Sequence, residues 1–356
     1  MTKRPEIYKT FIQDNTLINE MKNCLHSNNG VLNPYHLENS VFHHTLMVFA
    51  NADLDNITEM VMALCHDIGK VITRKVKDDG SKVTFYGHSD ASIQPTIDFI
   101  DRLYVNDVIS IDELYEFINY GLPAMSNHML YYQNIHKINM ISNGNKTIKK
   151  YLLKMAYMDS RGSICKGEKV DSKKDIIYDK FTPMIIDPSL PNVYLWCGLP
   201  GSGKDYLAEN FGNNTPIISF DDIRVKLYKE THSTNGIPED EIYANAFKYC
   251  NDNNIDLNKS LRKEVQYYIK NNQDVSICNT SLTRKARRSI INSISYKKCN
   301  IIVNQVFTPT KIILDRNDKR KSKTVPRHAI NRMMIHMTVV THFEKNINMI
   351  NYIYNR

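Results

Sequence analysis

The sequence predicts an all-α domain followed by an α/β domain with a parallel sheet. Before about residue 185, apolar residues recur every three or four positions, which is typical of amphipathic helices. After it, short apolar runs alternate with helical patterns, as they do in parallel α/β sheets. A polar stretch over residues 166–175 and the prolines Pro183, Pro188 and Pro191 separate the two patterns. We therefore expect one domain, with its connector, over residues 1–185 and a second domain over residues 186–356.

The individual elements follow from the same patterns. The three-to-four spacing predicts helices over Val41–Phe49, Ile57–Leu64, Ile93–Leu103, Leu114–Ile118 and Ile148–Met158. The short apolar runs predict strands over Val193–Cys197, Pro216–Ser219, Val275–Cys278 and Asn300–Phe307, with helices between them.

The composition is that of a folded, soluble protein. The 356-residue chain is 42% apolar and 24% charged, which is a globular composition with room for two cores. It has no run of about 18 apolar residues, and its first residues lack the apolar core of a signal peptide. We therefore expect a cytoplasmic protein without a membrane segment. The seven cysteines are scattered and form no C-x-x-C pair, which favours neither a disulfide framework nor a thiolate zinc site.

Positive charge is concentrated in the second half of the chain. Residues 1–185 carry 21 Lys+Arg and 22 Asp+Glu, whereas residues 186–356 carry 25 and 16, so the second half accounts for the whole net charge of +8. Its densest part, Lys311 to Arg332, has eight basic and two acidic residues. This balance suits phosphates or a nucleic-acid backbone, although most charge runs are simply solvated helix faces.

The stretch Gly198-Leu-Pro-Gly-Ser-Gly-Lys204 is a P-loop pattern between a predicted strand and a predicted helix. Backbone N–H groups and the helix N-terminus would hold phosphate oxygens, and the lysine would neutralise them. The Ser or Thr that normally follows and binds Mg²⁺ is replaced by Asp205, which offers the metal a carboxylate oxygen. The predicted site for ATP or another NTP with Mg²⁺ comprises Gly198, Gly201, Ser202, Gly203, Lys204 and Asp205.

Two further stretches predict the groups that transfer a phosphoryl group. The stretch Ser219-Phe-Asp-Asp-Ile-Arg224 ends the next predicted strand, and parallel strands bring their carboxyl ends beside the phosphate site. Asp221 is the candidate base for a hydroxyl acceptor, and Arg224, one helical turn on, would hold an acceptor phosphate. Arg316 and Arg320 are expected on one helical face, where they would close over the β- and γ-phosphates.

The order of these stretches resembles the 5′-hydroxyl polynucleotide kinases of phage and bacterial nucleic-acid repair over about residues 192–340. The resemblance rests on the GxPGSGK loop, the DDxR stretch, the polar strand end Cys278-Asn-Thr-Ser-Leu282, and R-N-D-K-R followed by Val325-Pro326. It implies that Lys204 is the P-loop lysine, Asp221 the general base, Arg224 the acceptor-binding arginine, and Arg316 and Arg320 the lid arginines. Asn279 stands where some members have Asp, so one carboxylate of the family is replaced.

The first half carries histidines and aspartates that suit a catalytic transition-metal ion. Cys65-His-Asp-Ile-Gly-Lys70 ends a predicted helix with the adjacent His66 and Asp67. His44 lies on the preceding predicted helix, with its neighbour His43 as the competing residue. Downstream come His88, Asp159, and His128 with His136 as its alternative.

This order of His, His-Asp, His, His and Asp resembles the HD phosphohydrolase superfamily over about residues 35–162. The resemblance implies one or two divalent transition-metal ions. His44, His66, Asp67 and Asp159 would hold one ion, with Asp67 as a candidate bridge. His88 and His128 would complete a second site or contact a substrate phosphate.

An HD-type domain followed by a P-loop kinase domain resembles the bacterial and phage HD-kinase end-healing enzymes over nearly the whole chain. The resemblance implies removal of 2′- or 2′,3′-cyclic phosphate ends and phosphorylation of 5′-OH ends, on RNA or DNA, with an RNA ligase acting downstream. One alternative is a nucleotide-metabolism enzyme that joins an HD nucleotidase to a small-molecule kinase, which has little need of the basic surplus of Lys311–Arg332. A second is a non-catalytic nucleic-acid-binding or nucleotide-sensing module.

Overall fold

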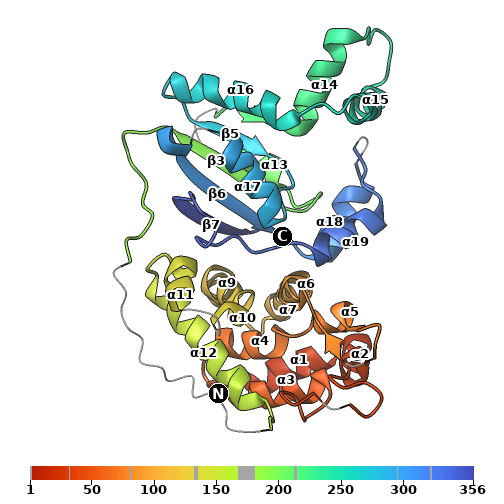
Figure 1. Cartoon of the computed structure of the whole chain (residues 1–356), viewed down its shortest axis with the longest axis vertical. Coiled ribbons are helices and arrows are strands. Elements are labelled where there is room, and N and C mark those ends of the chain that lie inside the picture. Colours follow the sequence, from red (N-terminus) through yellow and green to blue (C-terminus); the bar gives the residue numbers. More distant parts are fainter. Residues whose placement is uncertain are drawn as a thin grey trace. The chain divides into compact units, whose positions relative to one another are not determined.

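The computed structural model describes residues 2–31, 33–80, 82–131, 135–166, 181–211, 215–294, 296–320 and 323–356. Two units make up the chain, residues 1–183 with 334–343 and residues 184–333 with 344–356 (Figure 1). The first is mainly helical and the second contains a parallel sheet, as the sequence predicts. Most of the predicted connector, residues 167–175, lies outside the described residues.

The first unit is a set of helices whose starts are set by side-chain caps. Asp14, Ser40, Asn56, Ser110 and Asn145 each accept a backbone N–H in the first turn of the following helix. The helices are α1 (Arg4–Ile12), α2 (Asn15–Asn23), α3 (Val41–Ala50), α4 (Ile57–Cys65), α5 (Lys70–Thr73), α6 (His88–Ala91), α7 (Ile93–Val105), α8 (Ile111–Glu116), the π-helical η1 (Phe117–Gly121), α9 (Leu122–Met125), α10 (His128–Tyr131), α11 (Ile135–Ser142) and α12 (Lys146–Gly162).

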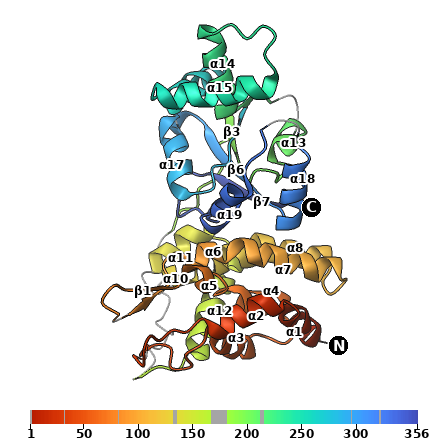
Figure 2. The same ribbon diagram turned by 90° about the vertical axis from the view of Figure 1, so that its right-hand side faces the viewer.

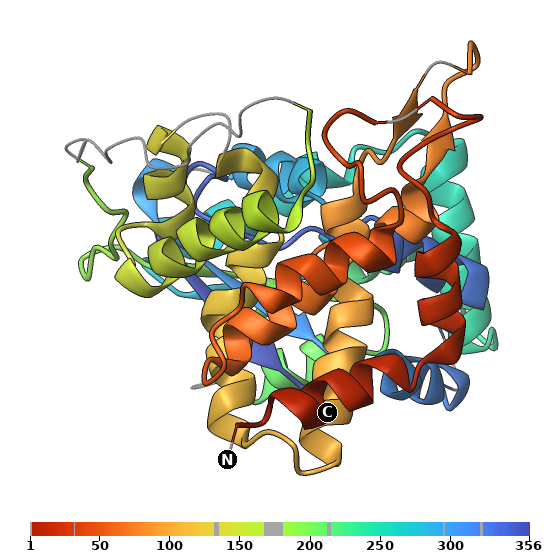
Figure 3. The same cartoon turned by 90° about the horizontal axis from the view of Figure 1, so that it is seen from below.

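All five predicted helices of this unit are present. The predicted helix Leu114–Ile118 falls across α8 and the π-helical turn, and the other four lie within α3, α4, α7 and α12. Helix α3 packs against α4 and α12, so the apolar faces predicted from the sequence form one core (Figure 3). The short antiparallel hairpin of β1 (Lys75–Val76) and β2 (Val83–Thr84) was not predicted.

The second unit is built on a five-stranded parallel sheet with the strand order β4-β5-β3-β6-β7. The strands are β3 (Asn192–Cys197), β4 (Ile217–Ile218), β5 (Val275–Cys278), β6 (Asn300–Phe307) and β7 (Met349–Tyr354). The first four were predicted. The edge strand β7 was not, because its six residues mix Asn with apolar residues and only the last is buried.

Helices cover both faces of this sheet. The helices are α13 (Lys204–Glu209), α14 (Phe220–Thr231), α15 (Glu239–Asp252), α16 (Leu257–Lys270), α17 (Arg284–Ser293), the 3-10 turn η2 (Tyr296–Lys298), α18 (Thr310–Asp318) and α19 (Arg327–Ile335). In Figure 2, α17 lies on one side of the sheet, and α13 and α18 lie on the other. Because all five strands are parallel, the loops that follow β3, β4, β5 and β6 meet at one edge of the sheet.

A buried ion pair fixes α17 within this unit. The Arg287 side chain is fully buried, and its Nε and Nη2 atoms donate to the two carboxylate oxygens of Glu344 at 2.9 and 2.5 Å. Its Nη1 donates to the backbone carbonyls of Ser281 and Leu282 at 3.0 and 2.9 Å. A buried guanidinium needs this set of acceptors, so the residue has a structural role and is not part of a basic surface.

Candidate active sites

The six predicted metal-binding residues of the first unit lie together. Their ligand atoms form two groups, His44–His66–Asp159 and Asp67–His88–His128, and within each group the atoms lie within 4.8 Å of one another. Helix α3 supplies His44, the end of α4 supplies His66 and Asp67, α6 and α10 begin with His88 and His128, and α12 supplies Asp159. The competing residues His43 and His136 are exposed, whereas His44 and His128 are buried.

The Asp67 carboxylate lies between the two groups. Its Oδ2 atom is 3.4 Å from His44 Nε2 and 3.3 Å from His66 Nε2, and its Oδ1 atom is 3.4 Å from His88 Nε2. On the far side of His44, Asp159 Oδ1 lies 3.1 Å from Nε2. One oxygen of Asp67 therefore faces each group, which is the arrangement that a bridging carboxylate requires.

The imidazole rings are oriented by acceptors at their Nδ1 atoms. The Nδ1 atoms of His66, His88 and His128 lie 3.0, 2.8 and 2.6 Å from the backbone carbonyl three residues earlier. His44 Nδ1 lies 3.0 Å from Glu38 Oε1. An acceptor at Nδ1 fixes the ring and leaves Nε2 as the free ligand atom, as in known metal sites with histidine ligands.

Electrostatics favour a cation at this cluster. Burial opposes ionisation of Asp67, but His66 and Lys70, whose Nζ is 2.6 Å away, hold its pKa well below the usual range. Burial also opposes protonation of His44, but the carboxylates of Asp159 and Glu38 raise its pKa to about 9. Ionised carboxylates among buried imidazoles are a donor set that fits a divalent transition-metal ion, which would take the place of the proton on His44.

Two residues that hold this cluster together were not predicted as functional. Ser92 Oγ lies 3.0 and 2.9 Å from the carbonyl oxygens of His66 and His88, and it accepts the N–H of Gly69 at 2.9 Å. A Cβ atom on Gly69 would lie 2.1 Å from the His88 carbonyl oxygen. The glycine of the C-H-D-I-G-K stretch is thus needed for α6 to approach, whereas no sequence signal pointed to Ser92.

In the second unit the P-loop has the geometry that its glycines predict. Gly201 and Gly203 have φ angles of +85° and +81°, and Cβ atoms there would lie 2.7 Å from the Ile313 carbonyl and 2.4 Å from the Asn355 amide nitrogen. Lys204 begins α13 after Gly203, and its Nζ lies 3.1 Å from Asp205 Oδ2. The loop and the lysine fit the phosphates of a nucleoside triphosphate, and the carboxylate fits its Mg²⁺.

A cavity of about 1250 Å³ lies beside this loop. Five of the predicted kinase residues line it: Lys204, Asp205, Asp221, Arg224 and Arg320. Arg316 is not among the lining residues, but its Nη1 atom is buried without a hydrogen-bond partner among the described residues and lies 3.3 Å from a Cβ position on Gly203. An unsatisfied guanidinium N–H next to a P-loop fits a phosphate oxygen.

Asp221 is held by two neighbours on its cavity side. Its Oδ1 atom accepts hydrogen bonds from Arg224 Nη1 at 2.7 Å and from the Tyr243 hydroxyl at 3.1 Å. The Arg224 guanidinium in turn lies 5.0 Å from the centre of the Phe247 ring. Tyr243 and Phe247 are four residues apart on α15, which packs against α14, and the sequence analysis missed both.

The predicted placement of the lid arginines is wrong in one respect. Helix α18 ends at Asp318, so Arg316 lies in the helix and Arg320 lies beyond it. The reason is a side-chain clamp: Asn317 Nδ2 donates to the Val325 carbonyl at 2.9 Å, and Asn317 Oδ1 accepts the Val325 N–H at 3.0 Å. The clamp turns the chain back, and Arg320 still lines the cavity.

Asn279 joins two edges of the cavity. Its Oδ1 atom accepts the backbone N–H of Phe220 at 2.9 Å, which ties the end of β5 to the start of α14. Its Nδ2 atom is buried and has no partner within the described part of the chain. The amide oxygen thus positions α14, and the amide nitrogen remains as a buried donor.

Two comparisons with known proteins match parts of the chain. A family model described as an AAA domain matches residues 193–340. The Multifunctional CCA protein of Pasteurella multocida (strain Pm70) is 33% identical over 101 residues, which are 26% of this chain and 23% of that protein. The chain thus spans less than a quarter of the length of this curated relative.

Two solved kinase structures are also similar. A sugar kinase from Janibacter sp. HTCC2649 is 14% identical, with a TM-score of 0.29 and coverage of 46% of this chain and 85% of that one. A putative kinase from Chloroflexus aurantiacus J-10-fl is 11% identical, with a TM-score of 0.30 and coverage of 47% and 87%.

The chain therefore carries an α/β domain with a P-loop and a parallel sheet after a helical region. A P-loop of this geometry fits the phosphates of a nucleotide with Mg²⁺. Among the described residues, no helix combines the length and the apolar character needed to cross a membrane.

Proposed function

We propose that this chain is a bifunctional nucleic-acid end-healing enzyme. The second unit would phosphorylate 5′-OH polynucleotide ends with an NTP, and the first would remove 2′- or 2′,3′-cyclic phosphate ends, chiefly of RNA. The observation that carries the proposal is the presence on one chain of a cavity beside the P-loop, lined by Asp221 and Arg224, and of a cluster of four histidines and two aspartates. Remade 5′-phosphate and 3′-OH ends are what a downstream RNA ligase requires.

In the kinase half, each predicted residue has a role that its position supports. The Asp221 carboxylate would orient the 5′-hydroxyl and accept its proton. Lys204, the last residue of the P-loop, and Arg316, beside Gly203, would hold the NTP phosphates. Arg320 would reach them from the cavity wall. Arg224, beside the base, would bind the phosphate that flanks the terminal nucleoside.

In the hydrolase half, the chain supplies a preformed set of ligands. His44, His66, Asp67 and Asp159 would hold one divalent ion, and His88 and His128, with Asp67 as a bridge, would hold a second. Bound ions would supply Lewis-acid chemistry to a phosphate ester. The protein's own contribution is to fix the rings through their Nδ1 atoms and to keep both carboxylates ionised in a buried site.

A polynucleotide acceptor accounts for two features that a small-molecule kinase leaves unused. The cavity, at about 1250 Å³, exceeds the roughly 300–1,000 Å³ of common small-ligand pockets and has room for a nucleotide and part of a second substrate. The basic surplus of the C-terminal half, 25 Lys+Arg against 16 Asp+Glu over residues 186–356, suits a phosphate backbone.

Paired assays on the purified chain test both halves. Asp221→Asn and Lys204→Ala should abolish NTP-dependent labelling of a 5′-OH oligonucleotide and leave release of phosphate from a 2′-phosphorylated oligonucleotide intact. Asp67→Ala should do the reverse and lower the transition-metal content found by elemental analysis. Asp240→Asn, a carboxylate that lines the same cavity, is the control for the kinase half.

Specific outcomes would contradict the proposal. Loss of both activities in a folded single variant would indicate one shared site. Retained metal and retained 2′-phosphatase activity in Asp67→Ala would overturn the hydrolase assignment. Equal losses for nucleoside and oligonucleotide acceptors in Arg224→Ala would favour the small-molecule kinase instead.

A further inference from the structure

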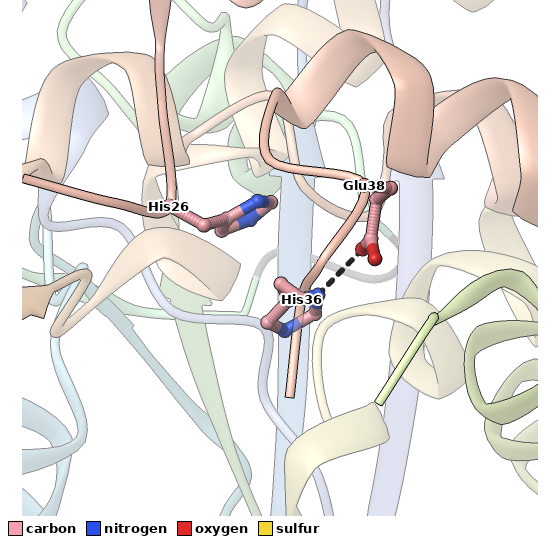
Figure 4. Close-up of side chains that lie close together, drawn as sticks. All are labelled: His26, His36 and Glu38. Atoms are coloured by element: carbon pink, nitrogen blue, oxygen red, sulfur yellow. Dashed lines mark hydrogen bonds and ion pairs between the residues drawn. The ribbon is translucent and has the colours of Figure 1, made fainter. Parts of the chain in front are cut away.

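A third cluster of metal-ligating side chains lies outside the six residues of the proposed hydrolase site. His26 follows α2, and His36 and Glu38 lie in the segment that leads into α3 (Figure 4). Each offers one ligand atom, and the three atoms lie within 4.8 Å of one another. His26 and the Glu38 side chain are buried, whereas 21% of the His36 side chain is exposed. The cluster is therefore shielded on one side and open to solvent on the other.

The hydrogen bonds of the cluster leave one histidine nitrogen, Nδ1 of His26, without a partner among the described residues. His36 Nδ1 lies 2.8 Å from Glu38 Oε1, as the dashed line in Figure 4 shows, and Glu38 Oε2 accepts the Ile164 N–H at 3.0 Å. The rings of His26 and His36 are stacked, with centroids 4.2 Å apart. His26 Nδ1 is buried and finds no hydrogen-bond partner in the described parts of the chain. Buried ring nitrogens are almost always satisfied, so a missing ligand is the direct explanation.

The other nitrogen of His26 is occupied, which keeps Nδ1 available. His26 Nε2 lies 3.2 Å from Lys70 Nζ, whose charge is balanced by Asp67 at 2.6 Å. A ring nitrogen without a hydrogen-bond partner is available to bind a metal ion.

We propose that His26, His36 and Glu38 form a third divalent transition-metal site, separate from the proposed hydrolase cluster. Two imidazoles and one carboxylate are a donor set typical of Zn²⁺, Fe²⁺, Co²⁺ or Ni²⁺ and leave positions open for water or a substrate oxygen. The exposed edge of His36 gives the ion a path from solvent. The inference does not depend on the hydrolase activity proposed above.

Glu38 connects this site to the hydrolase cluster. Its Oε1 atom lies 2.8 Å from His36 Nδ1 and also 3.0 Å from Nδ1 of His44, whose Nε2 faces Asp159 and Asp67. An ion bound to Glu38 would withdraw negative charge from the carboxylate that orients His44. We therefore expect occupancy of the third site to change the affinity of the hydrolase cluster for its own ion.

Metal counting on the full chain tests the site directly. The protein is stripped with a chelator, titrated with Zn²⁺, desalted and measured by elemental analysis. His36→Gln and His26→Gln should each bind one ion fewer than the wild type. His43→Gln, an exposed histidine next to His44, should keep the wild-type count. Asp67→Ala should lose ions of the hydrolase cluster but keep the third ion, which the added His36→Gln change should remove.

The outcomes separate the two proposals. Wild-type Zn²⁺ content in both His36→Gln and His26→Gln, with unchanged circular dichroism, would overturn the third site and leave the cluster as a hydrogen-bond network. A loss of one ion in His36→Gln combined with an unchanged count in Asp67→Ala would support the third site and contradict the hydrolase site. If the buried His26 variant fails to fold, the partly exposed His36 variant decides the result.

Discussion

The carboxylate of Asp205 should weaken the binding of metal-free ATP. Its Oδ2 atom lies 3.1 Å from Nζ of Lys204, the group that would otherwise meet the phosphates. An incoming triphosphate must break this pair and then lies beside a residual negative charge. With Mg²⁺ present, the same carboxylate becomes a favourable neighbour, because it can bind the ion directly or through water. We therefore expect the sign of its contribution to depend on the metal.

The size of the effect follows from the exposure of the pair. Only 8% of the Lys204 side chain is exposed, but 53% of Asp205 is, so solvent screens the attraction. Ion pairs of this kind contribute up to about 1 kcal/mol, which corresponds to about fivefold in a dissociation constant. Repulsion between the carboxylate and the triphosphate acts in the same direction. Asp205→Asn should thus bind metal-free ATP about fivefold more tightly than the wild type.

Calorimetric titration with ATP, once in EDTA and once with Mg²⁺, measures both effects. The gain in affinity that Mg²⁺ provides should be smaller in Asp205→Asn than in the wild type, and Asp205→Ser should keep 5′ labelling. Glu209→Gln, a carboxylate further along α13 that lines the same cavity, should change neither value. If Asp205→Asn bound metal-free ATP no more tightly than the wild type, the proposed competition for Lys204 would be refuted.

Three further predictions concern the second unit. Tyr243→Phe removes a hydrogen bond of 3.1 Å to the Asp221 carboxylate, which is worth about 1.5 kcal/mol. The kcat for 5′ phosphorylation should therefore fall about tenfold, with KM for ATP unchanged. An unchanged kcat would contradict this prediction. Glu344→Gln leaves the buried Arg287 without a counter-charge and should lower the free energy of unfolding, measured by urea denaturation, by about 3–5 kcal/mol. Wild-type stability would show that the backbone carbonyls alone are enough to stabilise the buried guanidinium. Asn317→Ala should release the loop after α18 and slow single-turnover phosphoryl transfer more than it weakens ATP binding; equal effects on both would argue against a lid.

Local patterns in the sequence determined much of the fold. Helices α3, α4, α7 and α12 and strands β3, β5 and β6 lie close to their predicted positions because each has a clear apolar periodicity or a short buried apolar run. The P-loop was predictable since Gly201 and Gly203 adopt backbone angles that other residues rarely accept.

The features that were missed depend on contacts between distant segments. Tyr243 reaches Asp221 across 22 residues only because α15 packs on α14, and no local pattern encodes that packing. Arg320 leaves the helix because the side chain of Asn317 captures the backbone eight residues on. Glu38 comes from a non-helical segment, where periodicity gives no information about the direction of a side chain.

The short contact between Arg224 and Asp221 has a consequence for the fate of the nucleotide. In the proposed kinase, the guanidinium, 2.7 Å away, and the Tyr243 hydroxyl both donate to Oδ1 of Asp221, which leaves Oδ2 to accept the proton of the 5′-hydroxyl. A phosphate on the acceptor would bind the same guanidinium and so place the terminal hydroxyl beside that oxygen. Water carries no phosphate and would not be positioned by Arg224, so the proposed enzyme would hydrolyse its NTP slowly in the absence of a broken strand.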